Sequence, residues 1–335
     1  MQFENVLIVG GAGYVGSLLV PQLLADGHRV TVYDTMWYGS DFLTENNSCL
    51  SLIRGDIRDI ERFSQAVSDH DAVINLACIS NDSSFELDEA LSTSVNLHAF
   101  APMVTASKKA GVKRFIYASS SSVYGVSDSP DVTEDHPLVP LTLYNKYKGM
   151  CEPQLFDQTD DNFVGVVVRP ATLCGYAPRQ RLDLSVNILT NHGYHNGVVK
   201  VFGGAQMRPN LHVRDMVRVY QILLEADDSC VRNEVFNCGF QNMSIADIAQ
   251  RVTEIVPEFR PDLGEVSIEV VPSDDQRSYH VNSDKITRVL GFEPEFTVAD
   301  AIRDLCEAFA DGLLPDSLTD SHYVNVQRMK ELNVQ

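Results

Sequence analysis

The apolar and polar positions of the first 170 residues alternate between two periods. Short runs rich in Val, Ile, Leu and Tyr are separated by longer stretches in which apolar residues recur with helical spacing. The length and the β-branched content of the short runs identify them as strands. Strands and helices that alternate at this spacing predict parallel strands joined by right-handed crossovers. The predicted strands cover residues 6–9, 30–33, 51–54, 72–77 and 114–118.

This order of elements predicts an α/β fold with a doubly wound parallel sheet of the Rossmann type. Residues 95–110 have the pattern of one helix, which ends at Gly111. A later helix, from about residue 143, is expected to kink or end near Glu152 because Pro153 follows. Beyond about residue 170 the alternation loosens, which indicates a smaller α/β domain in the C-terminal part.

Three glycines, Gly10, Gly13 and Gly16, follow the first strand and open the first helix. Such a turn can be purely structural, but between a strand and a helix it is typical of a dinucleotide site. One glycine makes the tight turn, a second lets the backbone approach a pyrophosphate, and the third lets the helix pack on the strand. The N-terminus of the helix offers unpaired N–H groups to the phosphates.

The second strand ends at Asp34, about twenty positions beyond the glycines. An acidic residue at this distance typically accepts hydrogen bonds from the adenosine ribose hydroxyls. Its charge would repel a 2′-phosphate, and the next basic residue along the chain is Arg54. The sequence therefore predicts NAD rather than NADP as cofactor, although a solvent-facing acid at the end of a strand is the alternative.

Serines and a Tyr/Lys pair follow the fifth strand. Residues 119–122 are four consecutive serines, and Tyr144 and Lys148 lie four positions apart, on one face of a helix. A neighbouring Lys can lower the pKa of a phenol, so that Tyr144 could act as a base near neutral pH. By itself such a pair is an ordinary helical pattern. It becomes specific in combination with the serines and the glycine turn.

Together, these elements resemble the extended short-chain dehydrogenase/reductase family, and within it the NAD-dependent nucleotide-sugar epimerases and dehydratases. Later stretches, 208–215, 237–239 and 291–294, also match the family pattern. The resemblance implies a cofactor domain of residues 1–170 that also uses about 212–240, and a substrate domain with a C-terminal tail in 171–335. The expected cofactor-binding residues are Gly10, Gly13, Tyr14, Val15, Gly16, Asp34, Asp56, Ile57, Leu76, Ala77, Asn96, Tyr144 and Lys148.

The resemblance assigns catalysis to Ser120, Tyr144 and Lys148. Ser120 would hydrogen-bond the sugar oxygen that loses its proton to Tyr144, and Lys148 would hold the nicotinamide ribose. The next two positions are Ser121 and Ser122. The family's 4,6-dehydratases carry an Asp-Glu pair there, its decarboxylases keep a Glu at the second, and its 3,5-epimerising members have a Cys there. The turn instead resembles that of 4-epimerases of UDP-sugars.

Several functions share the oxidation step and stay open at this point. The leading hypothesis is a nucleotide-sugar 4-epimerase, which oxidises C4 and returns the hydride to the opposite face. A 4-dehydrogenase or a ketoreductase would use the same residues. A non-catalytic NAD-binding protein is the alternative from another class, but such relatives typically lose the Tyr or the Lys.

Arginines are the expected ligands for the substrate diphosphate, because each guanidinium can bind phosphate through two hydrogen bonds. Where the family usually has Asn, this chain has Thr172, and Cys174 replaces a Tyr. Cys174 is expected to be a buried structural thiol. The predicted substrate-binding residues are Ser120, Ser121, Thr172, Arg179, Arg208 and Arg277, with Arg181 as a further candidate.

The amino-acid composition of the chain restricts its possible binding partners. The 335 residues carry a formal net charge of −20, which argues against binding to nucleic acid or to an anionic membrane. Seven scattered cysteines without metal-ligand spacing indicate reduced thiols and no metal site, and the expected compartment is the cytoplasm. By resemblance we expect a homodimer, with an interface that includes the apolar residues Val95, Phe100, Met103 and Val104.

Overall fold

The computed structural model describes residues 2–43, 47–127, 129, 131–272 and 278–334. The strands of the main sheet are β1 (Asn5–Val9), β2 (Arg29–Asp34), β3 (Leu50–Arg54), β4 (Ala72–Asn75), β5 (Arg114–Ala118), β6 (Val164–Pro170) and β10 (Glu234–Cys238). They form one sheet in the order β10-β6-β5-β4-β1-β2-β3, and all neighbours are parallel. The predicted doubly wound parallel sheet is confirmed.

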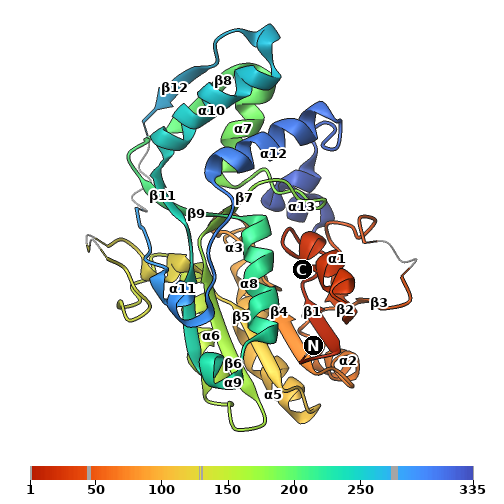
Figure 1. The fold of residues 1–335 in the computed structure, drawn as a ribbon. Helices are drawn as coiled ribbons and strands as arrows, with labels where there is room; N and C mark the ends of the chain where they lie inside the picture. The colour runs from red at the N-terminus through yellow and green to blue at the C-terminus, as the bar shows by residue number, and fades with distance from the viewer. Residues whose placement is uncertain (1, 44–46, 128, 130, 273–277, 335) are drawn as a thin grey trace.

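Helices cover both faces of this sheet (Figure 1). They are α1 (Gly16–Ala25) and α8 (Val213–Glu225) on one face, and α2 (Ile60–Ala66), α5 (Phe100–Lys109) and α6 (Leu143–Phe156) on the other. Successive residues of a strand point to opposite faces. In β1, Val6 and Ile8 accordingly pack with the first group of helices, and Leu7 and Val9 with the second. Burial on both faces explains why the strands are almost continuously apolar.

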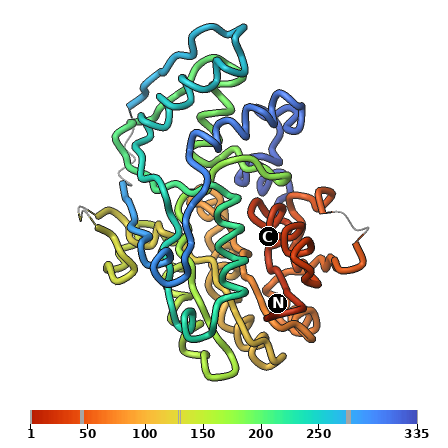
Figure 2. Tube along the Cα trace, viewed as in Figure 1, coloured from red at the N-terminus to blue at the C-terminus, as the bar shows by residue number. Residues whose placement is uncertain are grey.

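A smaller part of the chain lies beyond the carboxyl ends of the strands, at the top of Figures 1 and 2. Its strands form two small sheets, β11 (Gln241–Ser244)-β9 (Met207–His212)-β7 (Thr172–Cys174) and β12 (Ser267–Val271)-β8 (Val198–Phe202). Its core is shared by α7 (Ser185–Asn196), α10 (Ile245–Phe259) and α12 (Val298–Ala310), and it includes the buried thiol of Cys174. The shorter helices are α3 (Asp82–Phe85), α4 (Glu89–Thr93), α9 (Asp228–Val231), α11 (Asp284–Leu290) and α13 (Asn325–Leu332).

The chain returns to the main sheet after leaving it. β10 pairs with β6, and α8 packs against α1. We therefore propose that the cofactor domain consists of residues 1–170 together with about 212–240, as the sequence suggests. The rest of 171–335 would form the second domain and the tail.

The single helix expected over residues 95–110 is not a regular α-helix in its first turn. Helix α4 runs into a π-helical turn at Ser94–His98, and only then does α5 begin. The wider turn directs the buried side chain of Asn96 at the backbone of Ile79, with which it exchanges two hydrogen bonds of 2.9 Å. The end of the helix agrees with the prediction, since α5 stops just before Gly111, which has a φ of +86°.

The helix end predicted near Glu152 is also wrong, because α6 continues through Pro153 to Phe156. A proline in a helix removes one backbone donor, and here it stands within the last turn. Cys151 and Leu155, on either side of it, are fully buried in the core beneath the sheet. Their burial keeps the last turn of the helix in place.

Three of the four apolar residues expected at a dimer interface are buried within the chain itself, and the fourth, Val95, is half-buried. Phe100, Met103 and Val104 are 3%, 0% and 0% exposed, because α5 turns them toward the chain's own sheet. The exposed apolar side chains of this region lie instead on α6 and on the loop before it, and they include Leu138, Val139, Leu141, Leu143 and Met150. A homodimer stays a prediction.

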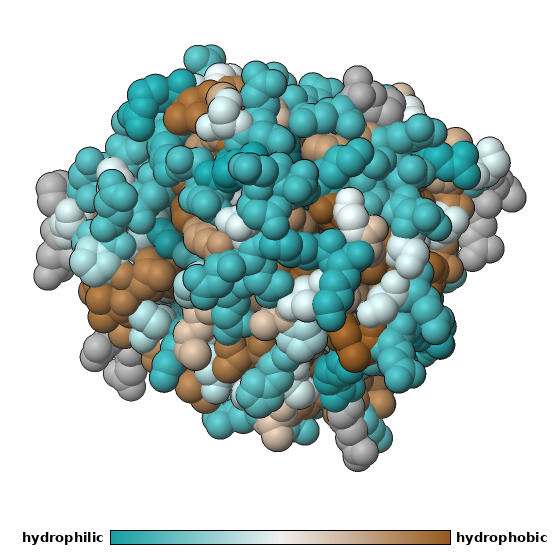
Figure 3. All heavy atoms as spheres, turned by 90° about the horizontal axis from the view of Figure 1, so that it is seen from below, coloured by the Kyte–Doolittle hydropathy of each residue, from teal (hydrophilic) through white to brown (hydrophobic). Residues whose placement is uncertain are grey.

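The surface seen in Figure 3 is largely hydrophilic, with separate hydrophobic patches. In the described part of the chain, no helix is both long and apolar enough to cross a membrane. All seven cysteines are free thiols. The described residues contain no group of three or more His, Cys, Asp or Glu side chains arranged to hold a metal ion.

Candidate active site

A cavity of about 770 Å³ lies at the carboxyl ends of the central strands. Residues at the ends of β1, β2, β4 and β5 line one side of it, among them Gly10, Asp34, Leu76 and Ala118. Its position coincides with the boundary between β1 and β4, from which the strand order runs in opposite directions. Open α/β sheets bind ligands at such a switch point. The smaller part of the chain closes the opposite side.

Two of the three glycines of the turn are required by close contacts within the protein itself. Gly10 has a φ of +81°, and a Cβ there would lie 2.6 Å from the backbone nitrogen of Ala77. A Cβ on Gly16 would lie 2.1 Å from the carbonyl oxygen of Gly11, so the helix can approach the turn only without a side chain. Gly13 differs, because it lines the cavity and a Cβ there would meet only the carbonyl oxygen of Gly10, at 3.2 Å.

Asp34 ends β2 with its carboxylate beside the glycine turn. One carboxylate oxygen accepts the N–H of Ala12 at 3.0 Å and the other accepts that of Met36 at 2.7 Å. Burial raises the pKa of Asp34, and the two backbone hydrogen bonds and the charge of Arg179 partly offset this rise. A carboxylate held by two backbone donors has a fixed orientation, and its remaining lone pairs can accept further hydrogen bonds.

Asp56, the other predicted acidic contact, is paired within its own loop. Burial raises the pKa of its carboxyl group, but hydrogen bonds from Arg58 more than offset this and leave it below the usual value. The guanidinium of Arg58 approaches the carboxylate to 2.7 Å. This pair fixes the carboxylate at the end of the cavity where Ile57 and Gly55 also lie.

The Tyr/Lys pair lies on α6, whose N-terminus is capped by the hydroxyl of Thr142. Lys148 is 3% exposed and its ammonium group donates to the carbonyl oxygen of Ala118 at 2.7 Å. Burial raises the pKa of Tyr144 well above its usual value, and Arg181 is the group that lowers it. The expectation that Lys148 depresses this pKa is therefore wrong for this arrangement, because its ammonium is engaged with the end of β5.

The serines form a 3₁₀ turn, Ser121–Tyr124, that is tied to the same helix. The hydroxyls of Ser120 and Ser122 lie 2.7 Å apart, and Ser122 donates to the side-chain oxygen of Asn145 at 2.5 Å. Since the single proton of Ser122 is used there, Ser120 donates to Ser122. The oxygen of Ser120 also accepts the N–H of Ser122 at 3.2 Å. The chain of contacts places Ser120 and Tyr144 in the lining of one cavity.

A family model described as the NAD dependent epimerase/dehydratase family matches residues 6–239. The chain belongs to this family. It is therefore an NAD-dependent enzyme, and the resemblance predicted from the glycine turn, the serines and the Tyr/Lys pair is confirmed.

Named relatives of this epimerase/dehydratase family member differ in their reactions. This chain is 28% identical over 322 residues to a UDP-glucose 4-epimerase of Rhizobium meliloti, and the alignment covers 89% of this chain and 95% of the relative. It is 26% identical over 327 residues to a dTDP-glucose 4,6-dehydratase of Streptomyces niveus, covering 92% and 93% of the two chains.

Solved structures agree with this grouping. MoeE5 in complex with UDP-glucuronic acid and NAD matches with a TM-score of 0.77 and 25% identity, over 92% of this chain and 99% of that one. A UDP-glucose 4-epimerase of Thermotoga maritima, solved with UDP-glucose, has a TM-score of 0.82 over the same shares of the two chains. Because its identity is 24%, it shows the fold alone.

The residues around the glycine turn fit NAD. The bare backbone at Gly13 keeps space open at the N-terminus of α1, where a pyrophosphate would be bound. The fixed carboxylate of Asp34 offers acceptors to ribose hydroxyls. The cavity is lined by the predicted cofactor residues Gly10, Gly13, Tyr14, Val15, Gly16, Asp34, Asp56, Ile57, Leu76, Ala77, Tyr144 and Lys148, and by the predicted catalytic and substrate residues Ser120, Thr172, Arg179 and Arg208.

Two of the predicted site residues that the structure describes do not line this cavity. Asn96 lies behind it and holds the backbone of Ile79. Ser121 is buried in the serine turn at 1% exposure. Arg277 lies outside the described residues. The role of Asn96 is therefore to position the loop after β4.

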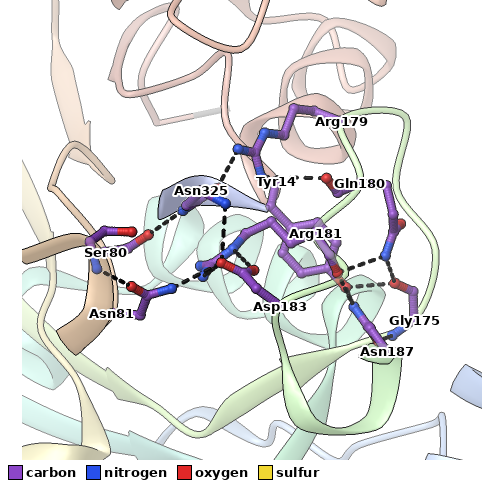
Figure 4. Close-up of polar contacts among 11 residues, drawn as sticks. Tyr14, Ser80, Asn81, Gly175, Arg179, Gln180, Arg181, Asp183, Asn187 and Asn325 are labelled. Carbon is purple, nitrogen blue, oxygen red and sulfur yellow. Dashed lines mark hydrogen bonds and ion pairs between the residues drawn. The ribbon is translucent and has the colours of Figure 1, made fainter. Parts of the chain in front are cut away.

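A polar cluster lines the cavity where the loops after β4 and β7 meet, and of its members Asp183 and Asn81 were not predicted from the sequence (Figure 4). Asp183 is its centre, with Arg181 bound through both carboxylate oxygens at 2.9 and 3.2 Å and the amide of Asn81 at 2.9 Å. Burial raises the pKa of Asp183, but Arg181 more than offsets this and keeps it low. Asn81 has a φ of +72°, an unusual conformation for a non-glycine residue and a frequent mark of functional sites.

Replacing Asp34 with Ala is expected to weaken NAD binding about 10- to 100-fold. The variant loses the carboxylate acceptors for the ribose, and a hydrogen bond to a charged group contributes about 1.5–3 kcal/mol. Titration calorimetry with NAD measures the change, and Asp41→Ala, an exposed acid in the next loop, is the control. NAD affinity in Asp34→Ala equal to that of the control would remove Asp34 from the cofactor site.

Proposed function

We propose that this enzyme is a nucleotide-sugar 4-epimerase. One observation carries the proposal: Ser120, Tyr144 and Lys148 line one cavity, while the two positions after Ser120 hold Ser121, which is buried, and Ser122, which donates to Asn145. A 4,6-dehydratase needs acidic side chains there to remove water. The relatives named as UDP-glucose 4-epimerases support the same reaction class.

Besides Asp34 and Asp56 on the cofactor side, two acidic residues, Asp82 and Asp183, line the cavity, and both have structural partners. Asp183 is bound by Arg181 and Asn81. Asp82 accepts the hydroxyl of Thr142 at 2.7 Å, and so ties the loop after β4 to the start of α6. These contacts support a role in shaping the sugar pocket rather than in the elimination of water.

In the proposed reaction, Tyr144 removes the proton from the C4 hydroxyl of the sugar and Ser120 hydrogen-bonds the same oxygen. NAD, when bound, would supply reversible hydride transfer at C4, which the exchange of one sugar configuration for the other requires. Lys148 is buried beside the end of β5, where it would hold the nicotinamide ribose. Burial raises the pKa of Tyr144, and the charge of Arg181 favours its ionised form.

We propose that the nucleotide diphosphate lies on the side of the second domain. Arg208 lines the cavity, its guanidinium stacks over the ring of Tyr279 at 5.7 Å, and it donates to the carbonyl oxygen of Met207. Thr172 lines the same region from β7. Arg277 stays a candidate for a second arginine that binds the diphosphate. Ser121 stays a candidate for substrate binding only indirectly, through the position of the turn that it helps to form. In an acidic protein, an anionic substrate depends on such local cations.

The test is to incubate the purified protein with a panel of UDP-, GDP- and dTDP-sugars and to follow NADH absorbance and the sugar by NMR. A new C4 epimer without net NADH is expected, and it identifies the substrate. Accumulation of NADH with a 4-keto sugar would make the protein a dehydrogenase and overturn the proposal. Loss of the C6 hydroxyl would make it a dehydratase.

A further inference from the structure

The chain ends in a segment, residues 314–334, that passes from the second domain to the cofactor side. Its start is anchored in the second domain, where Leu314 is buried in the core. Ser317 donates to the side chain of Asn191 on α7 at 2.7 Å. Further on, the carbonyl oxygen of Tyr323 accepts the N–H of Leu182 at 2.8 Å. The segment is therefore fixed to the loop that follows β7.

The end of the segment, helix α13, packs on loops that belong to the main sheet. Met329 is 1% exposed and packs with Ile79, from the loop after β4, and with Leu91. The guanidinium of Arg328 donates to the carbonyl oxygen of Trp37 at 3.0 Å, three residues after Asp34. Helix α13 thus contacts the loops after β2 and β4, both of which line the cavity.

Asn325 is the residue at which these contacts meet (Figure 4). It is 4% exposed and lines the cavity. Its amide nitrogen donates to the hydroxyl of Ser80 at 2.9 Å, and its amide oxygen accepts from Arg179 at 2.6 Å. Its backbone N–H donates to Asp183 at 3.3 Å. One side chain thereby joins the loop after β4 to the loop after β7.

Arg179 is the cation that Asn325 holds. Arg179 lies next to the first turn of α1, and its backbone N–H donates to the hydroxyl of Ser17 at 3.2 Å. Its guanidinium stacks on Tyr38 at 3.9 Å and interacts with the charge of Asp34. Burial lowers its pKa to about 10, which still leaves it charged at neutral pH. Among the described residues, no acceptor reaches its Nε atom, although that atom is buried.

These contacts place Arg179 on the cofactor side, with a charge and a donor available beside the N-terminus of α1. The sequence predicts Arg179 only as a substrate contact. A buried N–H without an acceptor is unfavourable unless a ligand satisfies it. The side chain is therefore suited to an anionic or hydroxyl group of the bound dinucleotide.

We propose that residues 314–334 form a C-terminal clasp that retains NAD, with Asn325 as its positioning residue. The clasp connects the loops after β2 and β4 to the loop after β7 across the opening of the cofactor site. It also fixes Arg179 toward that site. NAD can then leave only when α13 detaches, so the clasp slows cofactor exchange. This role follows from the cofactor and the fold, and it does not depend on which nucleotide-sugar reaction the enzyme performs.

The first test compares Asn325→Ala with Gln327→Ala, an exposed position on the same helix. The dissociation rate is measured by loading each protein with NADH and following its fluorescence during a chase with excess NAD. Asn325→Ala is expected to release NADH about tenfold faster, as the loss of a hydrogen bond to a charged group predicts. Gln327→Ala should match the unmodified chain.

The second test is a chain that ends at Tyr323, which keeps the backbone bond to Leu182 but lacks α13. It should release NADH faster than Asn325→Ala while its circular dichroism spectrum and melting temperature stay close to those of the full chain. Folded variants with unchanged release rates would overturn the proposal. So would variants that no longer fold, because the segment would then serve stability rather than cofactor retention.

Discussion

Replacing Tyr144 with Phe is expected to reduce turnover at least 10³-fold and to leave NAD affinity nearly unchanged. The substitution removes only the hydroxyl that would take the proton from the sugar, and general base catalysis typically contributes 10²–10⁴-fold. The ring itself is retained, next to Cys78 and Asp82 of the loop after β4. Turnover is measured by NMR of the sugar product, and NAD affinity by calorimetry.

Tyr147→Phe is the matched control for this experiment. Tyr147 lies on the same helix, its ring contacts Phe85 at 5.7 Å between centroids, and it is absent from the lining of the cavity. The same loss of one hydroxyl should therefore leave turnover within about twofold. If Tyr144→Phe also kept turnover within tenfold of the unmodified enzyme, another group would have to be the base.

The fold and the core of the site could be predicted because their signals are local in the chain. Strands and helices follow from apolar spacing, and the glycine turn, the serines and the Tyr144/Lys148 pair each occupy one short stretch. In each stretch the backbone geometry alone brings the functional groups close together. The strand order then places the three stretches at one edge of the sheet.

The polar cluster and the clasp could not be predicted in this way because their contacts join distant segments. Asn81 and Asp183 are 102 positions apart, and Arg179 and Asn325 are 146 apart. No periodicity connects such positions. The sequence also could not decide on which side of the cavity Arg179 lies, since this depends on how the loop after β7 meets the start of α1.

The electrostatics of Tyr144 show the same limit. The helical spacing correctly places Lys148 on the same face, but the spacing does not determine where its ammonium points. In the structure, that ammonium binds Ala118, and the burial of Tyr144 raises its pKa. Burial depends on segments that fold over the phenol, and Cys78 and Asp82 of the loop after β4 are among the groups that raise this pKa further.

A buried ion pair beneath the serine turn supports the second large effect. Arg169 on β6 binds Glu152 on α6 at 2.6 Å, and both side chains are 5% exposed. Glu152 also accepts the hydroxyl of Ser119 at 2.6 Å. Arg169 further donates to the hydroxyl of Tyr124 at 2.7 Å, which donates in turn to Asn237 on β10. The pair therefore joins the helix of the catalytic residues to the turn that carries Ser120.

Arg169→Met is expected to lower the free energy of unfolding by about 3–5 kcal/mol, because it leaves the charge of Glu152 buried without its partner. Urea unfolding followed by circular dichroism measures the loss. Arg251→Met provides the control, since the exposed pair of Arg251 and Glu254 at 2.9 Å should contribute at most about 1 kcal/mol. The double variant Arg169→Met/Glu152→Leu should recover part of the stability, because no unpaired charge remains buried. Equal losses of unfolding free energy in Arg169→Met and Arg251→Met would show that burial does not set the strength of the Arg169–Glu152 pair. The serine turn would then depend on other contacts for its position.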